Sequence, residues 1–407
     1  MHVVVCGAGY AGLAATRRLE RSLPADVDLT LINETPDHVL QHELHRAIRS
    51  PSVVDDLTVS LPSLLDRTRV HVATVEKIDP QERVVHCSTG SIDYDVAVVA
   101  LGAETAFLGL EDVRENALEL KRRADPIGIR RRVLERIRDR STAGRVVVCG
   151  AGLSGIQVAG EIAALGRSLD ADRSPTVTLL EQCDTVAPEF PESFREEIES
   201  ALSDQGVDVR TETTVTGAAD DAVHLDGDES IGCDVLIWTG GIRGSTATDR
   251  ERQQVGPELR LDDRTFVCGD AARVTDDTGT RVPATAQTAI QQGWTVARNV
   301  TRLVDSIQSQ DPARIDVETG EVVTPESDSP AYPTPIMEEY RYRSPGWTVS
   351  VGTETVAIVE SRVLTGKPAR VVKAGVIARY LARLGEVRKA TRMARLELAG
   401  GRSGGVD

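Results

Sequence analysis

Two stretches of the chain show the same succession of apolar and polar positions. The heptapeptide Val-Val-Val-Cys-Gly-Ala-Gly occupies residues 3–9 and returns at residues 146–152. Each copy contains a β-branched apolar run, which is typical of a buried strand; a helical pattern follows it, and then a second apolar run. The helical patterns cover residues 13–19 and 156–165, and the second apolar runs cover 29–32 and 177–180. The pattern predicts two strand–helix–strand units and therefore an α/β protein with parallel sheets.

The turn between strand and helix carries three glycines in each copy. They are Gly7, Gly9 and Gly12 in the first copy and Gly150, Gly152 and Gly155 in the second. In such a turn the first glycine permits the tight bend, the second lets backbone amides approach a pyrophosphate, and the third lets the helix pack closely. An acid, Glu34 or Glu181, follows the second strand, where a carboxylate accepts hydrogen bonds from a ribose diol. We therefore expect two dinucleotide sites.

Two further apolar runs, at 94–100 and 264–268, are predicted to complete the first sheet. Because they lie on either side of the second glycine motif, the second domain is expected to be inserted into the first. The predicted boundaries are 1–110 and 246–325 for the first domain, 111–245 for the second, and 326–407 for a small C-terminal α+β region.

The C-terminal region begins with a polar linker and ends with a basic helix. The linker is marked by Pro325, Pro330, Pro333 and Pro335. Short strands are predicted at 348–351 and 356–359, and a helix at about 371–398. Its apolar positions at helical spacing are Val376, Ile377, Tyr380, Leu381 and Leu384. Its cations are Lys373, Arg379, Arg383, Arg388, Lys389, Arg392 and Arg395. This pattern favours an interfacial helix on an anionic membrane surface. The alternative is a helix docked on the acidic protein body, or on a second copy of the chain in a homodimer.

Charge excludes one class of partner. The formal net charge is −16, with 63 acidic and 47 basic residues, of which only five are lysine. A phosphate backbone needs a basic surface, so nucleic acid is excluded as a partner. Such an acidic, lysine-poor composition resembles that of proteins from a salt-rich cytoplasm. Residues 362–402 depart from it, with 11 arginines and lysines against two glutamates.

Membrane spans and a redox disulfide are not expected. No run approaches the roughly 18–20 apolar residues that cross a bilayer, and the first strand begins almost at Met1, which predicts a cytoplasmic protein. The six cysteines include no Cys-x-x-Cys pair, and those at 6, 149 and 268 lie in apolar strand-like runs as small buried thiols. His38, His42 and His45 lack a further ligand cluster, so no metal site is predicted.

Four segments outside the glycine motifs resemble one family. They are Cys233-Asp-Val-Leu-Ile-Trp-Thr-Gly240-Gly241, Phe266-Val-Cys-Gly-Asp270, Pro283-Ala-Thr-Ala286-Gln287-Thr-Ala-Ile-Gln291-Gln-Gly293 and His38-Val-Leu-Gln41. Together with the glycine motifs, these segments resemble the pyridine-nucleotide-dependent flavoprotein reductases, and within them the type II NADH:quinone oxidoreductases. The likeness covers nearly the whole chain.

The resemblance implies two Rossmann-like domains of the glutathione-reductase type, with FAD in the first and NADH in the second. The residues implied for FAD, besides the first glycine motif and Glu34, are Gln41, Gly102, Asp270 and Ala286. Gly240 is implied for the nicotinamide, and Glu161 matches a family glutamate that we assign to catalysis. Gln287 and Gln291 match the family's quinone-site helix; being four residues apart, they project from one helix face. Pro283 is placed to start that helix.

The nicotinamide nucleotide is predicted to be NADH rather than NADPH. Glu181 is followed by Gln182, Cys183 and Asp184, with no arginine to receive a 2′-phosphate.

The electron acceptor is expected to be a membrane quinone, which places the enzyme at the inner face of the cell membrane. Two alternatives stay open: a soluble acceptor such as ferredoxin, and a slow NADH-sensing flavoprotein that binds a partner.

Overall fold

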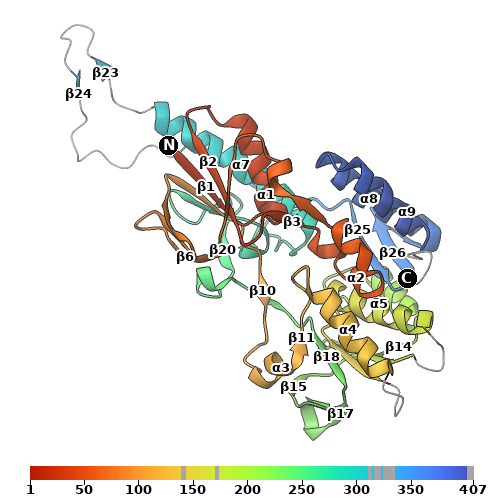
Figure 1. Cartoon of the computed structure of the whole chain (residues 1–407). Helices are drawn as coiled ribbons and strands as arrows, with labels where there is room; N and C mark the ends of the chain where they lie inside the picture. The colour runs from red at the N-terminus through yellow and green to blue at the C-terminus, as the bar shows by residue number, and fades with distance from the viewer. Residues whose placement is uncertain (139–143, 170–173, 310–313, 316–321, 324–334, 401–407) are drawn as a thin grey trace. The chain divides into compact units, whose positions relative to one another are not determined.

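The computed structural model describes residues 1–138, 144–169, 174–309, 314–315, 322–323 and 335–400. The chain divides into two compact units, each assembled from separate stretches that the colours of Figure 1 distinguish. Unit 1 comprises Met1–His38, Ser60–Ala103 and Arg243–Arg343. Unit 2 comprises Val39–Val59, Glu104–Ile242 and Ser344–Asp407.

A five-stranded parallel sheet forms the centre of unit 1, in the order β21-β9-β1-β2-β5. Its strands are β1 (His2–Cys6), β2 (Asp28–Asn33), β5 (Arg69–Val72), β9 (Val96–Val99) and β21 (Thr265–Val267). The register places Cys6 opposite Ile32 and Val99. Both neighbours of β1 are parallel to it, and its apolar residues are fully buried, as expected for a central strand of a parallel sheet.

Two helices of unit 1, α1 (Tyr10–Ser22) and α7 (Ala286–Ser309), lie side by side (Figure 1). Their close approach depends on Gly293, where a Cβ atom would lie 2.3 Å from the carbonyl oxygen of Ala11. The predicted start of α7 at Pro283 is wrong by three residues. Thr285 and Thr288 cap each other's amides with their hydroxyls, at 3.2 and 3.1 Å, and so set the start of the helix.

Smaller elements complete unit 1. They are the antiparallel strands β6 (Val75–Asp79), β7 (Val84–Cys87) and β8 (Gly90–Asp93), the parallel pair β20 (Gln253–Val255) and β22 (Ala272–Val274), the pair β23 (Arg314–Ile315) and β24 (Val322–Val323), and the 3-10 turns η3 (Leu61–Ser63), η6 (Thr246–Thr248) and η7 (Gly269–Ala271). Four of the five points at which the chain changes unit lie in or beside two short ladders. The ladders pair β3 (Asp37–Val39) with β4 (Thr58–Ser60), and β10 (Glu104–Thr105) with β19 (Ile242–Arg243).

Unit 2 contains a second five-stranded parallel sheet, in the order β11-β18-β12-β13-β14. Its strands are β11 (Ala117–Leu118), β12 (Arg145–Cys149), β13 (Thr176–Leu180), β14 (Val207–Arg210) and β18 (Val235–Trp238). Cys149 lies opposite Leu180, as Cys6 lies opposite Ile32 in unit 1. The two sheets therefore repeat the same central register.

Helices and two antiparallel sheets surround this second sheet. The helices are α2 (Arg46–Arg49), α3 (Glu111–Asn116), α4 (Asp125–Arg138), α5 (Leu153–Leu169), α6 (Glu192–Asp204), α8 (Gly366–Arg383) and α9 (Val387–Leu398), with the 3-10 turns η1 (Gln41–Glu43), η2 (Pro51–Asp55) and η5 (Asp226–Asp228). The sheets are β15 (Val215–Ala218), β16 (Ala222–Leu225) and β17 (Ser230–Gly232), and β25 (Gly346–Val351), β26 (Glu354–Val359) and β27 (Arg362–Thr365).

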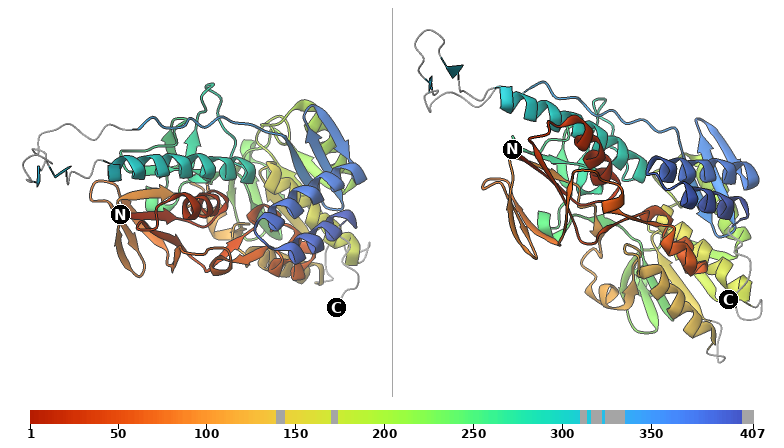
Figure 2. Two further views of the ribbon diagram at one scale, coloured as in Figure 1. Left: turned by 90° about the horizontal axis from the view of Figure 1, so that it is seen from above. Right: turned by 45° about the horizontal axis from the view of Figure 1, so that its top comes forward.

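Of the predicted C-terminal region, the part from Ser344 onward belongs to unit 2, and the part up to Arg343 belongs to unit 1. Unit 2 also contains the segment Val39–Val59, which the sequence predicted to lie in the first domain. The side chain of Ile48 in that segment joins the buried core of unit 2. The predicted helix at 371–398 is two helices, α8 and α9, which lie side by side in blue in Figure 2. The break falls at Gly385, whose φ of +90° favours glycine. Of the linker prolines, Pro325, Pro330 and Pro333 lie outside the described residues.

Candidate functional site

The first glycine turn has the shape of a phosphate cradle. Gly7 has a φ of +99°, and a Cβ atom there would lie 2.3 Å from the carbonyl oxygen of Ala100. A Cβ atom at Gly12 would lie 1.8 Å from the carbonyl oxygen of Gly7, so the helix packs directly on the turn. Gly9 faces open space, and no side chain caps the amides at the start of α1. Open space beside uncapped amides at a helix N-terminus suits a pyrophosphate.

The second glycine turn repeats these features in unit 2. Gly150 has a φ of +94°, and a Cβ atom there would lie 2.8 Å from Gly240. A Cβ atom at Gly155 would lie 1.9 Å from the carbonyl oxygen of Gly150, whereas Gly152 faces open space. Gly240 itself lies against the indole ring of Trp238, and a Cβ atom there would lie 2.7 Å from that ring. Each unit therefore holds one complete cradle.

The polar residue at the end of the second strand differs between the cradles. In unit 2 the carboxylate of Glu181 accepts a hydrogen bond from the amide of Ala151 at 2.7 Å. In unit 1 the equivalent contact, from the amide of Ala8, goes to Oδ1 of Asn33 at 2.9 Å. Asn33 thus occupies the position predicted for Glu34, which is exposed one residue beyond the strand end. The sequence contains the signal, because Thr-Leu-Ile-Asn at 30–33 aligns with Thr-Leu-Leu-Glu at 178–181.

Asp270 lies in η7, directly after β21. The preceding residue, Gly269, has a φ of +69°, and its amide donates to Oε1 of Gln292 on α7 at 2.7 Å. A Cβ atom at Gly269 would lie 2.9 Å from Cβ of Ala11 on α1, so the Asp270 turn lies beside the first turn of that helix. Gly102, with a φ of +70°, follows β9 at the same edge of the sheet. The structure therefore brings Asp270 and the first cradle together within unit 1.

The two glutamines of α7 share a partner that the sequence did not reveal. Gln287 and Gln291 both donate through Nε2 to the carbonyl oxygen of Arg343, at 3.3 and 3.0 Å. The hydroxyl of Tyr340 donates to Oε1 of Gln291 at 3.4 Å. Tyr340 is buried, which raises the pKa of its hydroxyl. Ala286, the first residue of α7, lies one residue before this pair. The prediction that both amides face one direction is confirmed, and residues 340–343 join the candidate site.

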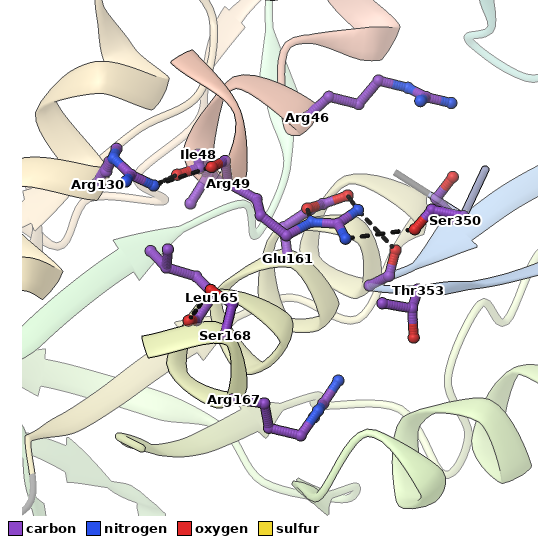
Figure 3. A network of polar contacts seen from close by, with 12 residues as sticks. Arg46, Ile48, Arg49, Arg130, Glu161, Leu165, Arg167, Ser168, Ser350 and Thr353 are labelled. Carbon is purple, nitrogen blue, oxygen red and sulfur yellow. Dashed lines mark hydrogen bonds and ion pairs between the residues drawn. The ribbon is translucent and has the colours of Figure 1, made fainter. Parts of the chain in front are cut away.

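Glu161, predicted to be catalytic, is buried on α5 and pairs with Arg49, with 2.7 Å between Oε2 and Nε (Figure 3). Burial raises the pKa of Glu161, and Arg49 opposes that rise. Arg130 of α4 donates to the carbonyl oxygens of Ile48 and Arg49 at 3.0 and 2.9 Å. These contacts bind the segment Val39–Val59 to the second sheet's helices. The catalytic role of Glu161 stays a prediction.

A buried charge cluster joins the same segment to the C-terminal helices. We use this name for Glu43, Arg46, Lys373 and Glu397, all less than 9% exposed. Arg46 pairs with both glutamates, and Lys373 lies 3.4 Å from Glu43. Burial alone would raise the pKa of Glu43, but Arg46 and Lys373 hold it well below its usual range. Burial lowers the pKa of Lys373 to about 8. Gln41, implied for FAD, is exposed in η1 at the start of this segment.

The apolar stripe predicted to enter a membrane is largely buried in unit 2. Ile377, Leu381 and Leu384 are each less than 9% exposed, because α8 packs against β26 and α9. Three predicted membrane cations have partners instead. Lys373 belongs to the buried charge cluster, Lys389 donates to the carbonyl oxygen of Thr58, and Arg392 lies 3.1 Å from Asp56. Docking on the protein body, the alternative reading, is therefore confirmed for this stripe.

The thiols of this chain are mostly buried. All six cysteines are free, and all except Cys183 are buried, as predicted for those at 6, 149 and 268. Burial raises the pKa of Cys268 to about 12. Within the described part of the chain, no group of three or more His, Cys, Asp or Glu side chains is arranged to hold a metal ion. None of the helices described is both long and apolar enough to cross a membrane.

Two complete glycine cradles, each at the carboxyl edge of its own parallel sheet, define a protein that binds two dinucleotides. Residues 1–293 match the family model described as pyridine nucleotide-disulphide oxidoreductase. The chain belongs to this family.

Curated relatives and solved structures agree with this assignment. A type II NADH:quinone oxidoreductase from Staphylococcus epidermidis is 27% identical over 414 residues, covering 95% of this chain and 96% of the relative. The structure of NDH2 from Plasmodium falciparum in complex with NADH has a TM-score of 0.78 at 14% identity and covers 99% of both chains. The sulfide:quinone oxidoreductase from Aquifex aeolicus has a TM-score of 0.75 at 17% identity, covering 99% of this chain and 96% of that one. These structural likenesses confirm the predicted fold of two dinucleotide-binding domains.

Proposed function

We propose that this protein is an FAD-dependent, non-proton-pumping NADH:quinone oxidoreductase of type II. The observation that carries the proposal is the pair of complete cradles in a chain whose six cysteines are all free. Two cradles suit a flavin dinucleotide and a nicotinamide dinucleotide, and six free, dispersed thiols supply no redox disulfide. Relatives called type II NADH:quinone oxidoreductases match along nearly the whole chain, which supports quinone as the acceptor.

Each cradle is proposed to bind one of the two dinucleotides. FAD, when bound, supplies the two-electron chemistry, and the protein binds and orients the reactants. Gly7, Gly9 and Gly12 would expose backbone amides to its pyrophosphate, with Asp270 beside them. Gly150, Gly152 and Gly155 would do the same for NADH, and the Glu181 carboxylate would accept from the free ribose diol. Because that carboxylate is charged, it would repel the 2′-phosphate of NADPH.

Gln287 and Gln291 are proposed to serve the acceptor. Their amides are neutral donors on one face of α7, and such donors stabilise a quinone carbonyl without placing a charge in an apolar channel. Both are half-buried, and both are held by the Arg343 carbonyl. That shared contact fixes their orientation before an acceptor arrives.

The site of action is proposed to be the cytoplasmic face of the cell membrane, with the protein attached peripherally. Val371 and Val376 of α8 and Val387 and Leu398 of α9 are more than half exposed. Together they are proposed as the apolar contact, and of the predicted stripe only Val376 is among them. Exposed cations of the same helices include Arg379, Arg383, Arg388 and Arg395. Each cation near an anionic surface contributes roughly 1 kcal/mol at ordinary ionic strength. Co-sedimentation with anionic liposomes should fall when all four apolar residues become serine. Failure of the unaltered protein to sediment at any salt concentration would refute the attachment.

A steady-state assay of NADH oxidation with quinones, ferredoxin and oxygen tests the proposed activity. Rapid turnover with soluble quinones is expected. Turnover with ferredoxin alone would establish a soluble acceptor, and slow reduction without turnover would establish an NADH-sensing protein. Acid precipitation should release yellow FAD into the supernatant, and flavin that remains in the pellet would contradict noncovalent binding.

A further inference from the structure

The Arg343 carbonyl that holds the two glutamines of α7 belongs to an irregular segment, residues 337–343, which we call the strap. Near the start of the strap, the amide of Glu338 donates to Oδ1 of Asn299 on α7 at 2.7 Å. Nδ2 of Asn299 donates back to the carbonyl oxygen of Glu338 at 2.9 Å. At the end of the strap, the Arg343 carbonyl accepts from both glutamines, at 3.3 and 3.0 Å. The strap is therefore fixed to α7 near both of its ends.

Between these ends, the strap is held by the turn that precedes α7. Asp276, which is 6% exposed, begins this turn. Its Oδ1 accepts from the amide and the hydroxyl of Thr278, at 2.9 and 2.7 Å, and from the amide of Thr280 at 2.9 Å. Its Oδ2 accepts from the amide of Tyr342 at 3.2 Å. One oxygen thus closes the turn, and the other holds the strap one residue before the Arg343 carbonyl.

A carboxylate suits this position because every printed contact of the side chain is with a donor. Burial alone would raise the pKa of Asp276, but the hydrogen bonds from Thr278, Thr280 and Tyr342 hold that pKa below its usual value. An asparagine could keep its oxygen on the donors of the turn, yet its amino group would then face the amide of Tyr342. The contact with the strap is the one that requires a carboxylate.

The strap also determines how the glutamine amides are oriented. The amide of Tyr340 donates to the carbonyl oxygen of Pro257 at 2.6 Å, and its hydroxyl donates to Oε1 of Gln291 at 3.4 Å. Both ends of the Gln291 amide therefore contact the strap. Gln287 and Gln291 each use one of two Nε2 hydrogens on the Arg343 carbonyl and keep the other for an acceptor.

We propose that Asp276 is a positioning residue for the reaction with the acceptor. By holding the amide of Tyr342 it fixes the neighbouring Arg343 carbonyl. That carbonyl orients the two glutamine amides, so that their remaining N–H groups bind a quinone carbonyl without first having to be ordered. The proposal rests on the proposed function in taking a quinone as the acceptor.

Hydrogen exchange followed by mass spectrometry tests the contact with the strap without any turnover. Asp276→Asn keeps an oxygen for the turn and opposes the amide of Tyr342. Loss of a hydrogen bond to a charged group corresponds to about tenfold in an equilibrium, so residues 340–343 should exchange about tenfold faster. Asp277→Asn is the matched control in the same turn. It removes only a contact of 3.7 Å with Arg341 and should leave exchange of the strap unchanged.

Stopped-flow reoxidation of the reduced flavin by a soluble quinone tests the role in the reaction. Asp276→Asn should lower the second-order rate constant for quinone about tenfold and leave reduction by NADH unchanged. In a protein that already carries Gln287→Ala and Gln291→Ala, Asp276→Asn should lower the rate constant no further, because its effect passes through those amides. A merely structural weakening would lower the rate constant by the same factor in both backgrounds.

Four results would overturn the proposal. They are unchanged exchange of the strap in Asp276→Asn, an unchanged rate constant for quinone in that variant, an equal fall with and without the glutamines, and an equal fall in Asp277→Asn. A reduced flavin that quinone does not reoxidise even in the unaltered protein would instead refute the proposed function.

Discussion

Replacing Glu397 with glutamine tests the contact by which α9 holds the segment Val39–Val59. Oε1 of Glu397 accepts from the hydroxyl of Thr355 at 2.9 Å, and Oε2 pairs with Arg46. Glu397 is 4% exposed and Arg46 8%, so solvent screens the pair little. Breaking a buried pair by removing one partner costs about 3–5 kcal/mol. Because Arg46 keeps Glu43, we expect the lower end, about 3 kcal/mol.

Hydrogen exchange followed by mass spectrometry locates this loss. A local destabilisation of about 3 kcal/mol speeds exchange through local opening roughly a hundredfold, and the effect should appear in α9 and residues 46–59. Glu360→Gln, at an exposed turn, is the matched control and should leave exchange unchanged. Unchanged exchange in α9 of Glu397→Gln would show that this buried contact does not hold the segment.

Three further outcomes follow from the site. Glu181→Ala should reduce the preference for NADH over NADPH in stopped-flow measurements of flavin reduction. Equal rates of reduction by NADH and NADPH in the unaltered protein would contradict the assignment of NADH. The double variant Gln287→Ala with Gln291→Ala should slow reoxidation of the flavin by quinone and leave its reduction by NADH unchanged. Arg343→Ala, which keeps the shared carbonyl, is the control. Slower reduction by NADH in the double variant would show that the acceptor site is misplaced. The pKa of Lys373 is about 8 in the folded protein and about 10.4 in an unfolded chain, so the unfolded state binds more protons between these values. The Tm of the unaltered protein, measured relative to that of Lys373→Met, should therefore rise as pH increases from 8 to 10. A Tm difference that does not change with pH would contradict the lowered pKa of the buried Lys373.

Local spacing explains what the sequence could predict. The glycine turns follow from rules that act over about ten residues, so both cradles and their strands were predictable. The equivalence of Asn33 and Glu181 was also present, but only in an alignment of the two repeats. Glu34 is the nearest acid after the strand, whereas the register of the strand places Asn33 at the position equivalent to Glu181.

Long-range partners explain what the sequence could not predict. An amphipathic pattern shows that one face of α8 is covered, but it does not show what covers it. The structure buries Ile377 and Leu381 in unit 2, where the sequence favoured a lipid surface. Arg46 and Glu397 are 351 residues apart, and no local pattern links two charges at that separation. The Arg343 carbonyl that orients Gln287 and Gln291 is a backbone atom, which has no signature in the sequence.

Anaerobic double-mixing stopped flow on the purified protein tests directly whether the flavin carries electrons from NADH to quinone. The first mix adds one equivalent of NADH and follows the bleaching of flavin absorbance; the second adds a soluble quinone and follows its return. NADH should bleach the flavin completely and quinone should restore its absorbance in full, each at a rate that matches or exceeds steady-state turnover. Flavin that NADH does not bleach, or bleached flavin that quinone does not reoxidise, would contradict this electron transfer.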